Sequence, residues 1–158
     1  MIHKIEYDDL PLAAAVIRES FATVAAEFGI TRQNGANHTA FLTVDKLQNH
    51  FHWGWQMYGY YHENMLVGYV SLSKESDTIY ELHNFAVLPA HRRNGYGKML
   101  LDFCKTQVLK WGCNQIHLSM IEENTRIKNF YSANGFVHVG TKKFEHLPFV
   151  SGYMEWHG

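Results

Sequence analysis

The sequence predicts an α+β fold with a central sheet of six to seven strands and about four helices. Apolar residues recur at helical spacing in four segments, and seven shorter runs are rich in β-branched and aromatic residues. The expected order is strand, two helices, three strands, helix, strand, helix and two strands. With 158 residues, 46% of them hydrophobic, the chain is long enough for one domain, residues 1–158, with a substantial core.

The first part of the chain is expected to hold one strand and two helices. A short edge strand covers residues 2–7, and a helix then starts at Asp8 and ends at Gly29. A polar, irregular stretch follows. The second helix covers residues 44–51 and is capped by Thr43.

The middle of the chain is expected to form three strands. An aromatic run at residues 53–61 and a second run at 65–73 flank a short polar turn, which is typical of a hairpin. Another polar turn leads into a strand at 78–88.

The last part alternates helices and strands. Helices are expected at 95–111 and 124–134, and strands at 115–121, 136–144 and 152–156. The strand at 115–121 has the apolar character of a strand that is buried on both faces.

Composition and charge argue against several classes of protein. The formal net charge of −1 gives no general attraction to nucleic acid, and no apolar run approaches the roughly 20 residues that span a bilayer. Residues 1–6 lack the apolar segment of a signal peptide. We therefore expect a cytoplasmic protein without a nucleic-acid or membrane partner.

A basic loop with two glycines separates the strand at 78–88 from the helix at 95–111. It reads Arg92-Arg93-Asn94-Gly95-Tyr96-Gly97-Lys98. A strand, a glycine loop and a helix together present free backbone N–H groups to an anion, and the glycines let the main chain approach it closely. The basic side chains add positive charge. The loop therefore predicts a phosphate-binding site.

Two other phosphate-binding motifs fit this loop poorly. A Walker A loop would need glycine in place of Arg92 and Ser or Thr in place of Met99, and a dinucleotide loop would need glycine in place of Leu100. The loop does match R-x-x-G-x-G, from Arg92 to Gly97. A basic turn before a helix is the simpler alternative.

A second motif lies on the next predicted helix. Asn124 is followed by Tyr131, seven residues later, and by Gly135 and Phe136 at the helix end. Together with the glycine loop, this pattern resembles the GNAT superfamily of acyl-CoA-dependent N-acetyltransferases, and the order of elements resembles it along essentially the whole chain. Ile127 departs from the family, which usually has a small residue at this position.

The resemblance implies a three-layer fold and a cofactor. The sheet would be mixed, mostly antiparallel and splayed between its fourth and fifth strands, with helices on both faces. Acetyl-CoA would be the acyl donor, with its pantetheine arm in the gap and its pyrophosphate at the loop. The residues implied in cofactor binding are Phe85, Ala86, Val87, Arg92, Arg93, Asn94, Gly95, Tyr96, Gly97, Lys98, Asn124 and Tyr131.

Three residues are candidates for catalysis. Some family members place a catalytic Glu fourteen residues before the first loop glycine, which is the spacing from Glu81 to Gly95. Glu81 is therefore the first candidate for a general base, and His83, with a reference pKa near 6.5, is its rival. By the resemblance, Tyr131 would lie beside the thioester sulfur and act as the acid.

Each of these residues also has a structural interpretation. Glu81 and His83 can simply pair with neighbours or reach solvent, Tyr131 can be a core aromatic, and Asn124 can cap its helix. In a regular strand, Glu81, His83, Phe85 and Val87 would share one face unless a bulge intervenes.

The leading hypothesis is acetyl transfer to a primary amine of a small molecule, an amino acid, a peptide or a protein. The alternative is a non-catalytic acyl-CoA-binding module or sensor. We expect no metal, because His50 and His52 lack a closely spaced cysteine or carboxylate. By the resemblance, residues 29–55 would border the acceptor. The identity of the acceptor, the length of the acyl group and a homodimer are left open.

Overall fold

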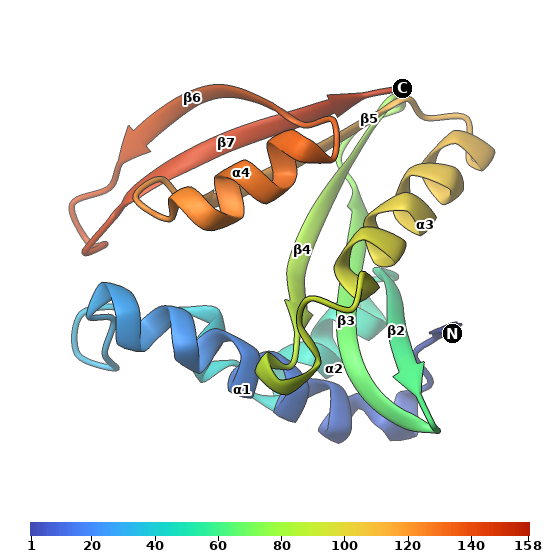
Figure 1. The fold of residues 1–158 in the computed structure, drawn as a ribbon, viewed down its shortest axis with the longest axis horizontal. Helices are drawn as coiled ribbons and strands as arrows, with labels where there is room; N and C mark the ends of the chain where they lie inside the picture. The colour runs from blue at the N-terminus through green and yellow to red at the C-terminus, as the bar shows by residue number, and fades with distance from the viewer.

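A computed structural model describes residues 1–158 as one seven-stranded sheet with helices on both faces (Figure 1). The strand order is β1-β2-β3-β4-β5-β7-β6. The strands are β1 (Ile2–Lys4), β2 (Gln56–His62), β3 (Met65–Lys74), β4 (Ile79–Val87), β5 (Gln115–Ile121), β6 (Val137–Lys143) and β7 (Val150–His157). The helices are α1 (Leu10–Phe28), α2 (Val44–His52), α3 (Tyr96–Lys110) and α4 (Thr125–Ala133). The predicted fold class and element order are confirmed.

Local sequence signals explain where the helices begin and end. Gly29 has a φ of 65° and ends α1, and its N–H donates to the carbonyl of Ala25. The Thr43 side chain accepts a hydrogen bond from the N–H of Lys46 at 3.3 Å and so caps α2. The predicted bounds of these two helices therefore agree with the structure to within a few residues.

The sheet divides between β4 and β5. These strands are parallel, and they pair only from Ile79 opposite Gln115 to Glu81 opposite His117. Beyond Glu81, β4 continues to Val87 without a ladder partner on this side, and the two strands diverge (Figure 1). All other neighbouring strands are antiparallel. The expected splay between the fourth and fifth strands is confirmed.

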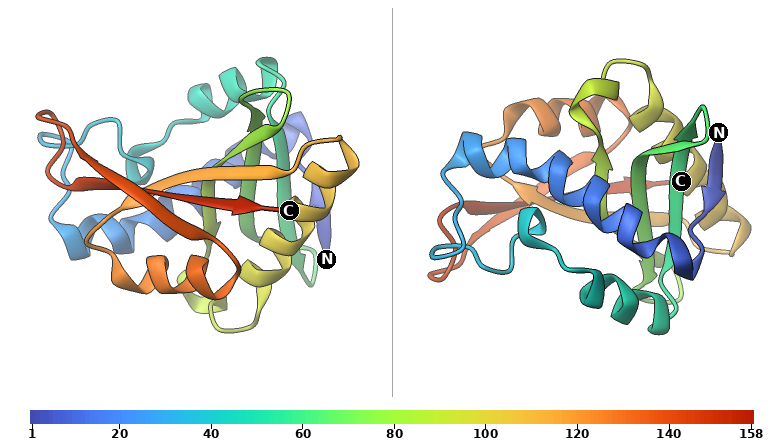
Figure 2. Two further views of the ribbon diagram at one scale, coloured as in Figure 1. Left: turned by 90° about the horizontal axis from the view of Figure 1, so that it is seen from above. Right: turned by 90° about the horizontal axis from the view of Figure 1, so that it is seen from below.

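The two faces of the sheet carry different helices (Figure 2). Helices α3 and α4 cover one face, with a core that includes Leu82, Leu100, Ile116, Leu118 and Met154. We call this the α3/α4 face. Helices α1 and α2 pack on the other face against β2 and β3, with a core that includes Leu10, Ile17, Leu47, Met57 and Tyr69. We call this the α1/α2 face.

The prediction that β5 is buried on both faces is wrong. Ile116 and Leu118 are buried in the α3/α4 core, whereas His117 is half-buried and Ser119 is exposed on the opposite face. Helix α1 contacts β3 and β4 rather than this part of the sheet. The α1/α2 face of β5 and β7 is therefore partly open, and polar side chains occupy it.

None of the helices combines the length and the apolar character needed to cross a bilayer.

Candidate active site

A bulge in β4 separates two groups of candidate residues. The register with β3 shifts between Tyr69 and Ser71, and Asn84 has a φ of 53°. Phe85 consequently packs in the α3/α4 core, whereas His83 contacts Ser73 on the α1/α2 face. The expectation that Glu81, His83 and Phe85 share one face is therefore corrected, because the extra residue reverses the alternation.

The loop before α3 presents six consecutive backbone N–H groups. Those of Arg93 to Lys98 have no hydrogen-bond acceptor in the protein, and no side chain caps the helix at Gly95. Such N–H groups, together with the helix dipole, favour an anion at this position. Gly95 has a φ of 80°, a left-handed conformation that glycine adopts easily, and phosphate binding at this loop stays a prediction.

Gly97 is required by a close approach between elements. A Cβ atom at this position would lie 3.1 Å from the Cζ of Phe85 and 3.3 Å from the Cζ of Phe130. The first turn of α3 can therefore lie directly against β4 and α4 only without a side chain here.

The basic side chains of the loop have different roles. Arg92 donates to the Val87 carbonyl at 3.1 Å and to the Ser20 carbonyl at 3.0 Å, so that it joins the loop to α1. Burial, with the nearby charge of Arg126, lowers the Arg92 pKa. Lys98 pairs with Asp102 at 2.6 Å. The Arg93 guanidinium forms no ion pair and is exposed, so it is the loop side chain that is free to meet a phosphate.

Asn124 caps α4 with one half of its amide. Its Oδ1 accepts a hydrogen bond from the N–H of Ile127 at 3.3 Å, and the residue is buried. No protein group accepts a hydrogen bond from its Nδ2, which is therefore left for another partner. The capping role is established, and a role in pantetheine binding stays a prediction.

Tyr131 is buried in an aromatic cluster on the α3/α4 face. Its ring lies 5.9 Å from that of Phe85 and 5.5 Å from that of Phe136, and only 5% of the residue is exposed. Burial raises the pKa of the Tyr131 phenol, with a smaller contribution from Cys104. The hydroxyl makes no hydrogen bond in the protein. A phenol in this state stays protonated at neutral pH, so its hydroxyl is available as a hydrogen-bond donor.

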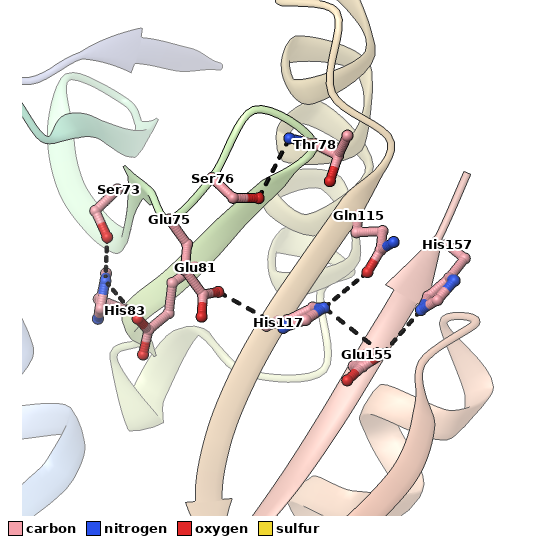
Figure 3. A network of polar contacts seen from close by, with 10 residues as sticks. All are labelled: Ser73, Glu75, Ser76, Thr78, Glu81, His83, Gln115, His117, Glu155 and His157. Atoms are coloured by element: carbon pink, nitrogen blue, oxygen red, sulfur yellow. Dashed lines mark hydrogen bonds and ion pairs between the residues drawn. The ribbon is translucent and has the colours of Figure 1, made fainter.

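Glu81 and His83 lie together on the α1/α2 face (Figure 3). Glu81 Oε2 lies 3.9 Å from His83 Nε2, which is also 2.7 Å from Ser73 Oγ. Burial raises the pKa of Glu81, and Glu75 adds to the rise. Burial, with His50, lowers the pKa of His83 to about 4. Glu81 is therefore a stronger base than a free carboxylate, whereas His83 is a weaker base than a free imidazole.

A stack of three rings holds His83 in place. The Trp55 ring lies 4.1 Å from that of His83 and 3.9 Å from that of His50, at interplanar angles of 16° and 15°. The stack joins β4 to α2 and excludes water from one side of His83. Trp55 was part of the predicted aromatic strand, but its contact with His83 could not be inferred from spacing.

Sequence analysis missed the polar residues that continue this network onto β5 and β7. His117 lies 3.6 Å from Glu75 and 3.6 Å from Glu155, and His157 lies 2.8 Å from Glu155 (Figure 3). His117 and Glu155 also line a hollow of about 400 Å³. The available signal was a polar residue at every second position of otherwise apolar strands.

The residues expected to border the acceptor differ in their surroundings, since some pack against aromatic rings and one is exposed. The His38 ring packs 6.4 Å from that of Phe149, in the turn between β6 and β7, and Arg32 lies over the ring of Phe41 at 4.7 Å. Trp53 is 66% exposed. Burial lowers the pKa of His38.

Comparison with known proteins identifies the family. The model of the Acetyltransferase (GNAT) family matches residues 22–136. An uncharacterized N-acetyltransferase of Bacillus licheniformis is 41% identical over 59 residues, which are 31% of this chain and 37% of that protein. The chain thus matches little more than a third of that relative's length.

Solved structures are similar over the whole chain. The ribosomal-protein-S18-alanine N-acetyltransferase of Escherichia coli has a TM-score of 0.80 at 16% identity, covering 99% of this chain and 92% of that one. The PaiA N-acetyltransferase of Thermoplasma acidophilum, in complex with coenzyme A, has a TM-score of 0.75 at 21% identity, covering 100% and 98%. At these identities the likeness concerns the fold.

Proposed function

Because the chain belongs to the Acetyltransferase (GNAT) family, we propose that it transfers an acetyl group from acetyl-CoA to a primary amine. The observation that carries this proposal is the run of free N–H groups from Arg93 to Lys98 beside the unpaired edge of β4. A diphosphate fits the N–H groups, and an extended amide chain fits the strand edge. No metal takes part in the proposed reaction.

The amine would approach from the α1/α2 face and lose its proton to Glu81. A lysine-like amine has a pKa near 10.4, so holding it neutral at pH 7 costs about 4–5 kcal/mol. The raised pKa of Glu81 brings its proton affinity nearer to the working pH, which favours a general base, directly or through a water. His83, with a pKa of about 4, is the poorer candidate.

The neutral amine then attacks the thioester carbonyl, the carbon–sulfur bond breaks, and the leaving thiolate takes a proton from the Tyr131 phenol. The second proton of the attacking nitrogen then restores the phenol. Tyr131 belongs to the core of the α3/α4 face, and in this proposal the sulfur leaves on that side of the gap. The leaving thiol has a pKa of about 8.5, so its thiolate needs only modest help. The products are the N-acetylated amine and coenzyme A.

The acceptor is a small molecule, an amino acid, a peptide or a protein amine. Proteins of similar fold are named for different acceptors, one for an alanine of a ribosomal protein and another for an aminoglycoside. We narrow the choice only to an amine that reaches the carboxylate of Glu81 on the partly open face of the sheet.

Calorimetry with coenzyme A and a thiol-release assay with acetyl-CoA and an amine panel test the proposal. Tight binding, with turnover that Tyr131→Phe lowers by about 10²-fold or less without weakening coenzyme binding, is the expected result. An absence of coenzyme binding would overturn it. Binding with no effect of Glu81→Gln or Tyr131→Phe on any activity would favour the second candidate, a non-catalytic acyl-CoA sensor.

A further inference from the structure

Two cross-strand pairs on the same face of β5 and β7, separated by the pair of Ile116 with Trp156, bring four side chains with metal-binding atoms together. In the antiparallel register, His117 lies opposite Glu155 and Gln115 lies opposite His157. Alternate residues of a strand share a face, so all four side chains point to the α1/α2 face of the sheet. Directly opposite residues have Cβ atoms about 4.5–5.5 Å apart, which fixes the group through the backbone.

The ligand atoms of this group already lie close to one another (Figure 3). Glu155 Oε1 is 2.8 Å from His157 Nε2 and 3.6 Å from His117 Nε2. Gln115 Oε1 is 2.9 Å from the same His117 nitrogen. Ligands bound to one tetrahedral zinc ion at about 2.0–2.1 Å are roughly 3.3 Å apart, so only small side-chain rotations are needed.

The charges of the group also suit a cation. Neither Glu155 nor Glu75 forms an ion pair with a lysine or arginine; their partners are histidines only. The pair of His138 on β6 with Glu122, which directly follows β5, is different, because Glu122 also binds Lys128. The carboxylates of the β5–β7 group therefore lack a lysine or arginine partner, whereas the ammonium group of Lys128 already pairs with Glu122.

A second layer supports His117. Glu75 Oε2, from the turn after β3, lies 3.6 Å from its Nδ1, while its Nε2 faces Glu155. A carboxylate on the far ring nitrogen of a histidine is the usual support of a metal ligand, because it fixes the ring and the tautomer. With 60% of its side chain exposed, His157 leaves a path for an ion.

We propose that His117, Glu155 and His157, with the amide oxygen of Gln115, form a binding site for one zinc ion. Two imidazole nitrogens and a carboxylate suit zinc better than calcium or magnesium, which prefer sets of oxygen ligands. The site adjoins the candidate active site, since His117 also lies opposite Glu81 in the sheet. It is separate from the acetyl-transfer chemistry, which needs no metal.

Calorimetric titration of the untagged chain with zinc chloride, together with visible absorption of the cobalt(II)-substituted protein, tests this site. We expect one saturable equivalent and the intense absorption of tetrahedral cobalt. His157→Ala should weaken zinc binding at least about tenfold, and this exposed position leaves the fold intact. Glu75→Gln should weaken it less.

His138→Ala is the matched control, because it also removes a histidine paired with a glutamate on the same sheet. It should leave zinc affinity and the cobalt spectrum unchanged. The proposal is wrong if no saturable zinc binding is seen, if cobalt gives only weak octahedral absorption, or if His157→Ala and His138→Ala weaken binding equally.

Discussion

The two faces of the sheet differ in the kind of groups they present and in the parts of the chain that supply them. On the α3/α4 face, the candidate binding groups are mainly backbone N–H groups of one continuous loop, held against the aromatic cluster around Tyr131. On the α1/α2 face, they are side chains from β3, β4, β5 and β7 that meet only because the strands pair (Figure 3). A local motif can encode the first arrangement, whereas only the fold can assemble the second.

The largest expected effect lies on the α1/α2 face. Glu81→Gln should lower kcat by about 10²–10⁴, because the amide cannot take the proton of the amine. Calorimetry should find unchanged affinity for coenzyme A, since the proposed cofactor-binding groups lie on the other face. Glu19→Gln, an exposed change on α1, is the control and should retain full activity. If Glu81→Gln lowered the affinity for coenzyme A as much as it lowers kcat, this result would contradict the division of roles between the two faces.

The next effect concerns stability in acid. Because burial lowers the His83 pKa from 6.5 to about 4, the unfolded chain binds a proton more readily than the folded protein between these pH values. The contribution of His83 is fully present above pH 6.5 and falls as the pH drops toward 4, by up to about 3 kcal/mol. Urea unfolding at several pH values should show that the free energy of unfolding falls less between pH 6.5 and pH 4 in His83→Gln than in the original chain. Equal losses would mean that His83 is not held neutral.

A change on the α3/α4 face should have an intermediate effect. Gly97→Val places branched carbon atoms where Phe85 and Phe130 already lie within 3.4 Å of a Cβ, and overpacking of this kind costs about 1–3 kcal/mol. The displaced loop should also bind coenzyme A more weakly. Gly140→Val is the control, because a Cβ there meets no atom within 4 Å. If both variants lost similar free energy of unfolding, the change in β-strand or helix propensity, and not the close approach at Gly97, would explain the loss of stability.

The smallest effect compares the two helix caps. Asn124→Ala on α4 and Thr43→Ala on α2 should each lower the free energy of unfolding by about 1 kcal/mol, because each removes one capping acceptor. Only Asn124→Ala should also weaken coenzyme A binding, measured by calorimetry, since its Nδ2 is free. If both variants bind coenzyme A equally well, Asn124 is a cap alone.

The same division explains how much the sequence could predict. The glycine loop and the Asn124–Tyr131 helix are short, continuous patterns, and the fold and family they indicated are confirmed. The strand β5 was assigned to the right residues but to the wrong environment, because its open face depends on where α1 ends up packing. The single extra residue at Asn84, which reverses the direction of Phe85, also has no reliable local signal.

The polar residues on the α1/α2 face were missed for a related reason. His117 and Glu155 are 38 positions apart in the chain, and only the β5–β7 register places them opposite each other. The contact of Arg92 with Ser20 on α1 likewise joins segments 72 positions apart. Sequence spacing reports neighbours along a helix or strand, but such contacts depend on the pairing of whole elements.

The gap between β4 and β5 has a consequence for the behaviour of the protein in a crowded solution. A strand with unpaired N–H and C=O groups ordinarily attracts another polypeptide, and proteins usually protect such strands at the rim of a sheet. Here the unpaired groups lie in the middle of the sheet, between strands that are still joined at one end. Because they lie between two strands rather than at the rim, they are less accessible to a foreign strand than the groups of an edge strand. The fold can thus offer unpaired backbone groups to a small ligand without exposing an edge strand that would promote aggregation.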